Sequence, residues 1–254
     1  MNPVLNNPLA RLIEVLELRS PLSDEDRKAI LALPYTLKSL APGSYAVREG
    51  EVPSGCGVLV SGFAYRQKLT GDGGRQILSI HIPGEALDFQ NIFLDVADHS
   101  VQMLTRGHVA LVPRADIQRI ARSSASIGHA ILISTLVEAS IFREWILNVG
   151  RRDAKSRLAH VLCELAVRLD AHGLADDMGY HLPMTQAELA DALGLTPVHL
   201  NRVIRSLEVD GLIHRSKRDV SFPDWERMRD IADFNDRYLH LAKQESGEQL
   251  VRRA

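Results

Sequence analysis

Residues 185–210, TQAELADALGLTPVHLNRVIRSLEVD, constrain the fold of this chain more than any other stretch. Thr185, followed three residues later by Glu188, has the pattern of a capping box, which starts a helix. A glycine then interrupts the helical pattern. Thr196 and Pro197 are typical of a second helix start. Threonine can cap a helix, and proline suits the first helical position because a backbone N–H there would have no partner within the helix. Two short helices joined by a glycine-containing turn predict a helix-turn-helix.

The second of these helices separates its residues into an apolar and a polar side. Val203, Ile204 and Leu207 are expected to face the protein core. The side chains left to point outward are His199, Asn201, Arg202 and Arg205. Such a helix can enter the major groove of DNA, although the same geometry also occurs in α-helical proteins that do not bind DNA.

The residues after the second helix, GLIHRSKRDVSF at 211–222, predict a two-stranded wing. A short apolar run leads to a basic turn that contains Arg215, Lys217 and Arg218, and strand-like alternation follows. From 196 to 218, five lysines and arginines oppose two acids, a local net charge of +3 on a chain whose overall charge is −2. A local positive surface favours contact with phosphates; an ordinary solvated charged face is the alternative.

The stretch LPMTQAELADALGLTPVHLNRVIRSLEVDGLI resembles the DNA-binding winged helix of the Crp/Fnr family of bacterial transcription regulators. The resemblance is close here and looser over most of the chain. It implies an α+β fold with an N-terminal antiparallel β-roll, similar to cupins and cyclic-nucleotide-binding domains, a long dimerisation helix and a C-terminal winged helix-turn-helix. The implied boundaries are a sensor at 1–125, a dimerisation helix at 126–150, a DNA-binding domain at 151–225 and a C-terminal helical extension at 226–254.

The resemblance also implies roles in DNA recognition. Arg202 matches the family's base-reading arginine and is suited to the O6 and N7 atoms of guanine. The best-known members carry a pair with a glutamate at the start of the recognition helix, where this chain has Pro197 and Val198. Val198 cannot accept a hydrogen bond but can touch a thymine methyl group. Further contacts to bases or to the DNA backbone are expected from His199, Asn201, Thr185, Thr196, Arg205, Lys217 and Arg218.

The N-terminal half has the composition of a β-rich domain. From about residue 40 to 112, glycines recur between short apolar and β-branched runs, which is typical of a compact barrel or sandwich. The GDGG sequence at 71–74 predicts a hairpin. The stretch PGSYAVREGEVPSGCGVLVSGFAY resembles the opening strands of the family's β-roll sensor. Ahead of these strands, a short amphipathic helix is predicted by the spacing of Leu9, Leu12, Ile13 and Leu16.

The sensor departs from the cyclic-AMP-binding branch of the family. The glycine–glutamate pair for the ribose is replaced at about 88–90, and the arginine–serine pair for the cyclic phosphate becomes His99-Ser100. An imidazole lacks the fixed charge and the bidentate geometry of a guanidinium. A gap in the alignment would make Arg106 an alternative cation. We expect a pocket for an unidentified effector, with cyclic AMP disfavoured and a cyclic-nucleotide-dependent module as the alternative. The pocket residues expected are Asp88, Phe89, Gln90, His99 and Ser100.

No cofactor or metal ion is expected. The oxygen-sensing branch of the family uses an N-terminal cysteine cluster, whereas Cys56 and Cys163 are far apart and follow no metal or redox spacing. His81, His99 and His108, together with Cys56, leave haem open as an alternative. Ten histidines in 254 residues would nevertheless place some in any domain by chance.

Residues 126–149 are apolar on at least two sides of a predicted helix. One side can pack on the sensor and another on a partner. In the resembled family this position holds the dimerisation helix, and a dimer supplies the two recognition helices that a palindromic site needs. The central helix of a monomer is the alternative. The residues expected at the dimer interface are Ile127, Ile131, Ile141 and Trp145.

Two features flank the DNA-binding domain. Gly150 is expected to mark a hinge, and Asp153 is expected to cap the next helix. The segment after the wing is expected to continue as a helix. Its predicted apolar side consists of Trp225, Met228, Ile231, Phe234 and Leu239.

The remaining expectations concern function class and location. No apolar run approaches the roughly 20 residues of a membrane span, and no secretion signal is apparent, so the chain is expected in the cytoplasm and not in a membrane. An enzyme is disfavoured because the sequence has no nucleophile motif, no metal-ligand spacing and no phosphate loop. The expected partners are double-stranded DNA with a palindromic operator, a second copy of the chain and a small effector. RNA polymerase is a further candidate.

Overall fold

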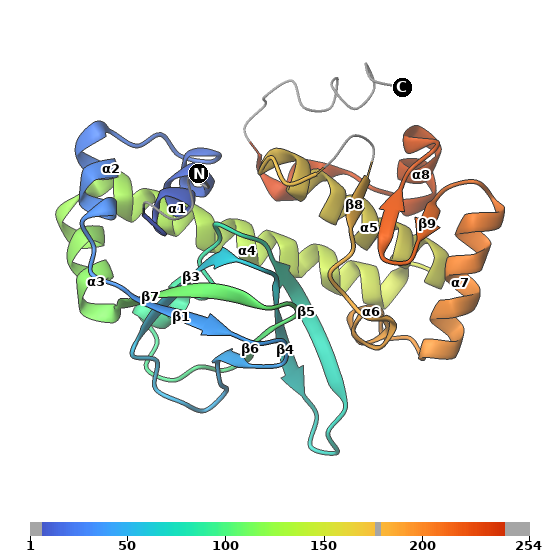
Figure 1. The fold of residues 1–254 in the computed structure, drawn as a ribbon, viewed down its shortest axis with the longest axis horizontal. Helices are drawn as coiled ribbons and strands as arrows, with labels where there is room; N and C mark the ends of the chain where they lie inside the picture. The colour runs from blue at the N-terminus through green and yellow to red at the C-terminus, as the bar shows by residue number, and fades with distance from the viewer. Residues whose placement is uncertain (1–6, 176–178, 242–254) are drawn as a thin grey trace. The chain divides into compact units, whose positions relative to one another are not determined.

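The computed structural model describes residues 7–175 and 179–241 and divides the chain into two compact units, residues 1–139 and 140–254 (Figure 1). One continuous helix, α4 (Ala125–Arg151), contributes its first part to one unit and its last part to the other. Each unit has its own buried apolar residues, so we describe each by itself.

The first unit is built on two antiparallel sheets, with strand orders β1-β7-β3 and β2-β6-β4-β5. The hairpin predicted at the GDGG turn is confirmed: it joins β4 to β5, and Gly73 takes the positive φ of +87° that such a turn requires. The strands are β1 (Thr36–Leu40), β2 (Tyr45–Val47), β3 (Gly55–Ser61), β4 (Ala64–Leu69), β5 (Arg75–His81), β6 (Ser100–Met103) and β7 (Gly107–Pro113).

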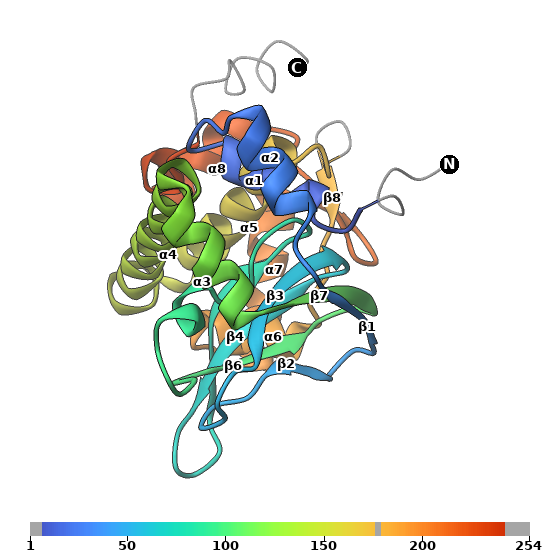
Figure 2. The same cartoon turned by 90° about the vertical axis from the view of Figure 1, so that its left-hand side faces the viewer.

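Helices gather at one end of this roll, where they pack with the first turns of α4 (Figure 2). The predicted N-terminal amphipathic helix is confirmed as α1, whose apolar side lies in the core. Asp26 joins the second helix to the start of α4, because its carboxylate accepts hydrogen bonds from the hydroxyls of Ser124 and Ser126, both at 2.6 Å. These helices are α1 (Ala10–Glu17), α2 (Asp24–Leu31), the 3-10 helix η2 (Phe89–Ile92) and α3 (Arg114–Ser123).

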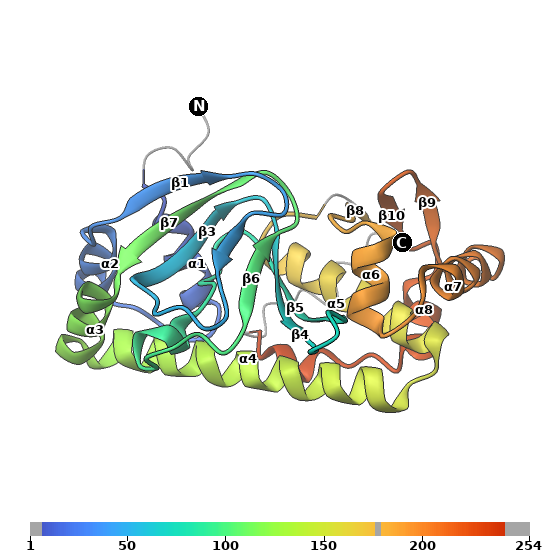
Figure 3. The ribbon, with the colours of Figure 1, turned by 90° about the horizontal axis from the view of Figure 1, so that it is seen from below.

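The second unit packs helices around α5 and adds a small sheet with strand order β8-β10-β9 (Figure 3). Strands β9 and β10 form the predicted wing, and β8 is a third strand that the sequence did not reveal. The elements are α5 (Ala154–Ala171), β8 (Gly179–His181), α6 (Gln186–Leu193), α7 (Pro197–Val209), β9 (His214–Ser216), β10 (Asp219–Ser221), α8 (Trp225–Ala232) and the 3-10 helix η3 (Asp236–Leu239).

Helix α4 is long and apolar enough to cross a membrane by length and composition alone. The sequence expectation that no run approaches a membrane span was therefore too strict, because the charged residues of this helix, Glu138, Arg143, Glu144 and Arg151, all lie in its second half and leave a long uncharged stretch before them. Packing accounts for part of its apolar character, since it has residues buried in both units. Gly150 lies inside the last turn of α4, and Asp153 caps α5 as predicted, accepting from the N–H groups of Lys155 (2.9 Å) and Ser156 (3.0 Å).

The segment after the wing does not form one continuous helix, as the sequence predicted. Helix α8 ends at Ala232, and Asp233 takes a left-handed conformation with φ +46° that stops it. After a short break, η3 follows. Four of the five predicted apolar residues are buried and Ile231 is half-buried, so the apolar pattern was right although the helix is broken. The predicted extension beyond residue 241 lies outside the described residues.

Candidate nucleic-acid interface and sensor interior

The helix-turn-helix forms as its local sequence predicts. The N–H of Thr185 donates to the Glu188 carboxylate (2.7 Å), and the N–H of Glu188 donates to the Thr185 hydroxyl (3.3 Å), which completes the capping box of α6. Gly194 ends α6 with a φ of +61°, in the left-handed region that favours glycine. Arg157 on α5 donates to the carbonyl of Leu193 (2.6 Å) and thereby holds the end of α6 in place.

Helix α7 presents a polar face to solvent. The Thr196 hydroxyl accepts from the N–H of His199 (3.2 Å) at its start, with Pro197 in the first turn. The buried side consists of Leu200, Val203, Ile204 and Leu207. The exposed side includes Val198, His199, Asn201, Arg202 and Arg205, with Glu208 and Val209 exposed near the end of the helix. The structure thus brings together the candidate recognition residues on one helix face.

One of these residues has a partner that the sequence did not indicate. The amide nitrogen of Gln186, at the start of α6, donates to the side-chain oxygen of Asn201 (3.1 Å). This bond occupies one acceptor position of the Asn201 side chain. The spacing of fifteen residues between the two gives no local signal, which is why the pair was missed.

The wing carries its basic residues at the turn between β9 and β10. Lys217 has a φ of +56°, and Lys217 and Arg218 are both exposed. The Arg218 carbonyl accepts from the N–H of Leu182 (2.8 Å), just after β8, so the third strand supports the wing. The turn therefore presents two cations on an anchored hairpin.

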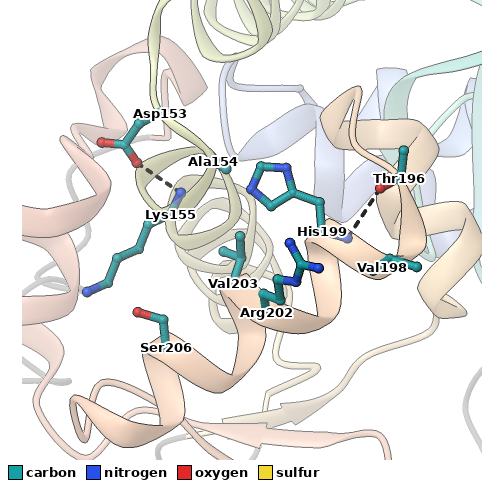
Figure 4. A pocket seen from close by; sticks show the side chains of 9 residues that line it. All are labelled: Asp153, Ala154, Lys155, Thr196, Val198, His199, Arg202, Val203 and Ser206. Atoms are coloured by element: carbon teal, nitrogen blue, oxygen red, sulfur yellow. Dashed lines mark hydrogen bonds between the residues drawn. The ribbon is translucent and has the colours of Figure 1, made fainter.

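A groove lies between the first turn of α5 and the exposed face of α7 (Figure 4). Lys155 adds a cation to this region, and its ammonium pairs with Asp210, next to the end of α7. Sequence reasoning missed Lys155 because it lies far from α7 along the chain. The groove is lined by Asp153, Ala154, Lys155, Thr196, Val198, His199, Arg202, Val203 and Ser206.

A buried polar network connects the end of α4, α5 and the segment after the wing. Glu164 on α5 accepts from the indole N–H of Trp145 (2.9 Å), the hydroxyl of Tyr238 (2.8 Å) and the guanidinium of Arg168 (3.2 Å). Burial raises the pKa of this carboxyl above its usual range. The ring of His160 lies 3.1 Å from the Tyr238 hydroxyl through Nε2. The network gives the C-terminal segment a packing role within this unit.

In the first unit, three of the five predicted pocket residues lie together. His99 is buried, with Nε2 at 3.2 Å from a carboxylate oxygen of Asp88 and Nδ1 at 2.7 Å from Asp98. The side-chain nitrogen of Gln90 lies 3.2 Å from the same Nδ1. The bond from His99 holds the pKa of the Asp98 carboxyl below its usual range.

The other predicted pocket residues, and the alternative cation, have different surroundings. Phe89 packs in the apolar core at the helical end of the roll. The Ser100 hydroxyl accepts from the backbone N–H of Glu49 (3.0 Å). Arg106 is exposed, between β6 and β7. None of these three contributes a cation to the group around His99.

The group around His99 does not suit the phosphate of a cyclic nucleotide. Asp88 is 1% exposed, and its carboxylate would face any anion placed beside His99. Both ring nitrogens of the imidazole lie within 3.2 Å of a carboxylate oxygen, one from Asp88 and one from Asp98, so carboxylates already occupy the positions from which an anion would approach the ring. A phosphate binds best where guanidinium or ammonium groups are free to surround it.

A buried arginine that the sequence did not single out lies in the same unit. Arg66 on β4 is 1% exposed. Its guanidinium donates to the carbonyl of Leu87 (2.7 Å) and lies 2.5 Å from the carboxylate of Glu138 on α4. The usual alternation of buried and exposed residues along a strand does not single out Arg66 in β4, because four successive residues, Ala64 to Gln67, are all buried.

The histidines considered for haem have protein partners. His81 Nδ1 lies 3.5 Å from the carboxylate of Glu85, and His108 Nδ1 lies 3.0 Å from the hydroxyl of Ser61. Within residues 7–175 and 179–241, no group of three or more histidine, cysteine, aspartate or glutamate side chains is arranged to hold a metal ion. Cys56 and Cys163 are both buried free thiols.

The four residues expected at the dimer interface are buried within their own protomer. Ile127 and Ile131 belong to the apolar core of the first unit, and Ile141 and Trp145 are buried in the second. The sequence of a helix that is apolar on several sides does not reveal which side packs in the protomer's own core. The prediction therefore assigned residues of the inward side to the dimer interface. The large apolar side chains that α4 exposes are Leu132 (54%), Leu136 (53%), Ile146 (72%) and Leu147 (44%).

Two family models match the chain. The model described as a cyclic nucleotide-binding domain matches residues 37–124, which contain all the strands of the first unit except the first residue of β1. The model described as a Crp-like helix-turn-helix domain matches residues 156–231, which contain α6, α7 and the wing.

Similar proteins cover most of the chain. The transcriptional activator protein FnrL of Cereibacter sphaeroides is 27% identical over 213 residues, which cover 82% of this chain and 85% of FnrL. The nitrogen fixation regulation protein FixK of Rhizobium meliloti is 26% identical over 203 residues, or 79% of this chain and 89% of FixK. The structure of FixK2 from Bradyrhizobium japonicum has a TM-score of 0.73 at 24% identity and covers 78% of this chain and 98% of that one, which shows a shared fold.

Proposed function

Because this chain belongs to the Crp/Fnr family of DNA-binding transcription regulators, we propose that it binds an inverted-repeat operator as a homodimer, under the control of a signal received by the β-roll. The observation that carries this proposal is the exposed polar face of α7, capped at its start and flanked by a basic wing. The named relatives are transcription regulators, which supports a regulatory rather than an enzymatic role.

In this proposal Arg202 reads a guanine and Val198 contacts a thymine methyl group. His199 and Asn201 contact bases or backbone at the same face. Phosphate contacts come from the residues around this face, since backbone contacts position a DNA-binding protein without reading sequence. These residues are Thr185, Thr196, Arg205, Lys217, Arg218 and, from the first turn of α5, Lys155.

The dimer forms along the exposed apolar residues of α4. Leu132, Leu136, Ile146 and Leu147 follow one another at intervals of four, ten and one, which places them within one stripe of a helix with 3.6 residues per turn. An exposed apolar stripe on a regular helix is the pattern of a helix that packs against another. A dimer of this kind provides the two α7 helices that an inverted repeat requires.

The effector is a small molecule or signal other than cyclic AMP. The carboxylates of Asp88 and Asp98 on either side of His99 support this part of the proposal. The match to the cyclic nucleotide-binding model favours the second candidate, a cyclic-nucleotide-dependent regulator. Titration calorimetry with cyclic AMP and cyclic GMP separates the two. Micromolar binding that His99→Ala abolishes would establish the second candidate.

The cytoplasm is the proposed location, where the chain meets DNA and, as a further proposed partner, RNA polymerase. We expect a selection from random DNA, using the purified protein with and without cell extract, to enrich an inverted repeat. The half-site centres should lie about 34 Å apart, one turn of B-DNA. Failure of the dimeric protein to enrich any inverted repeat in either condition would refute the proposed function.

A further inference from the structure

The inner face of the second sheet of the roll carries polar residues. Arg66 on β4 pairs in register with Ser79 on β5, and Ala64 pairs with His81, so these side chains share one face of the sheet. Arg66, Ser79 and His81 are all less than 5% exposed. Because a buried charge is costly unless it is paired and hydrogen-bonded, a buried arginine here needs specific partners.

The partners of Arg66 come from two other elements. Its guanidinium donates to the carbonyl of Leu87, directly before the 88–100 segment that holds His99, and lies 2.5 Å from the carboxylate of Glu138 on α4. The Glu138 side chain is 21% exposed, so this ion pair is largely shielded from water. One side chain therefore connects a strand of the roll, the His99 segment and α4.

The buried thiol of Cys56 is influenced by the same charges. Burial, and next the charge of Asp88, raise its pKa to about 12; Glu138 also raises it, whereas a hydrogen bond with the Asp88 backbone and the charge of Arg66 lower it. A phosphate anion brought into this region would face two carboxylates for one guanidinium that is already paired. Because the Arg66 guanidinium is already paired with Glu138, its charge is not available to an anionic ligand.

We propose that the Arg66–Glu138 ion pair is an internal replacement for a bound cyclic nucleotide: it fixes α4 to the β-roll and keeps the chain competent to bind DNA without that ligand. This inference rests on the proposed function as a dimeric DNA-binding regulator. Helix α4 runs without interruption from Ala125 to Arg151 and carries the exposed stripe proposed for dimerisation. The ion pair therefore sets the orientation in which the roll presents that stripe to a second copy. Arg66 and Glu138 are positioning residues, since neither lies on the DNA-binding face.

The test compares four forms of the full chain on the operator recovered by selection. They are the wild type, Glu138→Gln, the double variant Arg66→Met with Glu138→Leu, and Glu49→Gln as control. Glu49 pairs with Lys68 on the same strand β4, but both side chains are more than 40% exposed, so this pair should matter little. Operator affinity by fluorescence anisotropy, with and without cyclic AMP, is measured beside the melting temperature and the dimer dissociation constant.

We expect the wild type to bind the operator equally well with and without cyclic AMP. Glu138→Gln should lose about tenfold or more in operator affinity and should dissociate more readily into monomers, whereas Glu49→Gln should match the wild type. The double variant separates positioning from folding, because apolar replacement of a buried ion pair commonly preserves stability. It should have the melting temperature of the wild type but, like Glu138→Gln, bind the operator weakly.

Three results would overturn the inference. They are wild-type affinity in folded Glu138→Gln, wild-type affinity in the double variant, and a wild type that binds only when cyclic AMP is added. If Glu138→Gln does not fold, the double variant decides. A wild type that binds no inverted repeat under any condition is a different result, because it would refute the proposed function itself.

Discussion

Arg202 is the exposed side chain of α7 best suited to reading a base, since a guanidinium can donate to both O6 and N7 of guanine. We expect Arg202→Ala to cost roughly 1–3 kcal/mol of operator binding and to relax specificity at one base pair in each half-site. Anisotropy titrations against a panel of operators with single-base changes measure both effects.

Lys217→Ala, at the turn of the wing, is the matched control for the arginine. A lysine that contacts phosphate carries no sequence information, so its loss should weaken binding to all members of the panel alike and reduce the slope of log affinity against log salt by about 1. Identical behaviour of the two variants across the panel would show that the division into base reader and phosphate contact is wrong.

His160 should make the stability of the second unit depend on pH. Burial, and next the charge of Arg152, lower the pKa of this imidazole from 6.5 to about 3. Between these values the unfolded chain binds a proton at this site that the folded chain does not, so stability is full above pH 6.5 and falls as the pH falls toward 3. Each pH unit well inside this window costs about 1.4 kcal/mol.

We expect His160→Gln to flatten this dependence between pH 7 and about 5.5, because an amide does not titrate and can still hydrogen-bond the Tyr238 hydroxyl. Urea unfolding midpoints of the two proteins across this range provide the comparison. All other histidines are common to both forms, so parallel slopes would mean that His160 is not the group responsible.

At the scale of elements, α4 has an inward and an outward apolar side with different expected roles. Leu136 is 53% exposed, and Leu136→Asp should leave the protomer folded but separate the dimer, because two carboxylates would be buried close to the two-fold axis. Sedimentation should show a monomer with an unchanged melting temperature. A variant that sediments as a dimer would place the interface elsewhere.

Ile141→Asp is the matched variant on the inward side of α4. Ile141 is 7% exposed and belongs to the second unit, so a carboxylate there loses its water without gaining a partner. This variant should therefore melt at a lower temperature than the wild type, whatever its oligomeric state. If Ile141→Asp and Leu136→Asp gave the same melting temperature, the assignment of the two sides would be mistaken.

The elements of the recognition region could be predicted because their signals are local. The capping box at Thr185, the left-handed Gly194 and the start at Thr196 and Pro197 each act within a few residues, so the sequence alone specifies where α6 begins and ends and where α7 begins. The wing and the GDGG hairpin are also local, since short turns determine both.

Features that depend on contacts distant in sequence could not be predicted. Strand β8 joins the wing from almost forty residues before it, and Arg66 finds Glu138 seventy-two residues later. The inward side of α4 was misjudged for the same reason, because only the tertiary core distinguishes Ile141 from its exposed neighbours. The break at Asp233 was missed because an aspartate in the left-handed conformation has no strong local signature.

At the scale of the whole molecule, the charge distribution suits a protein that meets DNA with one surface. The chain carries a net charge of −2, whereas residues 196–218 carry +3, from five cations and two acids. Association with DNA should therefore weaken steeply with salt, mainly through this surface. The remainder of the protein, at −5 by difference, should contribute little to non-specific binding.

The spacing between half-sites tests most directly whether two α7 helices of one dimer read one inverted repeat. The operator recovered by selection is compared with a version that has half a turn of DNA, about 5 base pairs, inserted between its half-sites, and with a single half-site. A dimer with fixed spacing should bind both altered sites at least about a hundredfold more weakly than the operator, close to its non-specific affinity. Equal affinity for all three would contradict recognition by a two-fold pair of α7 helices.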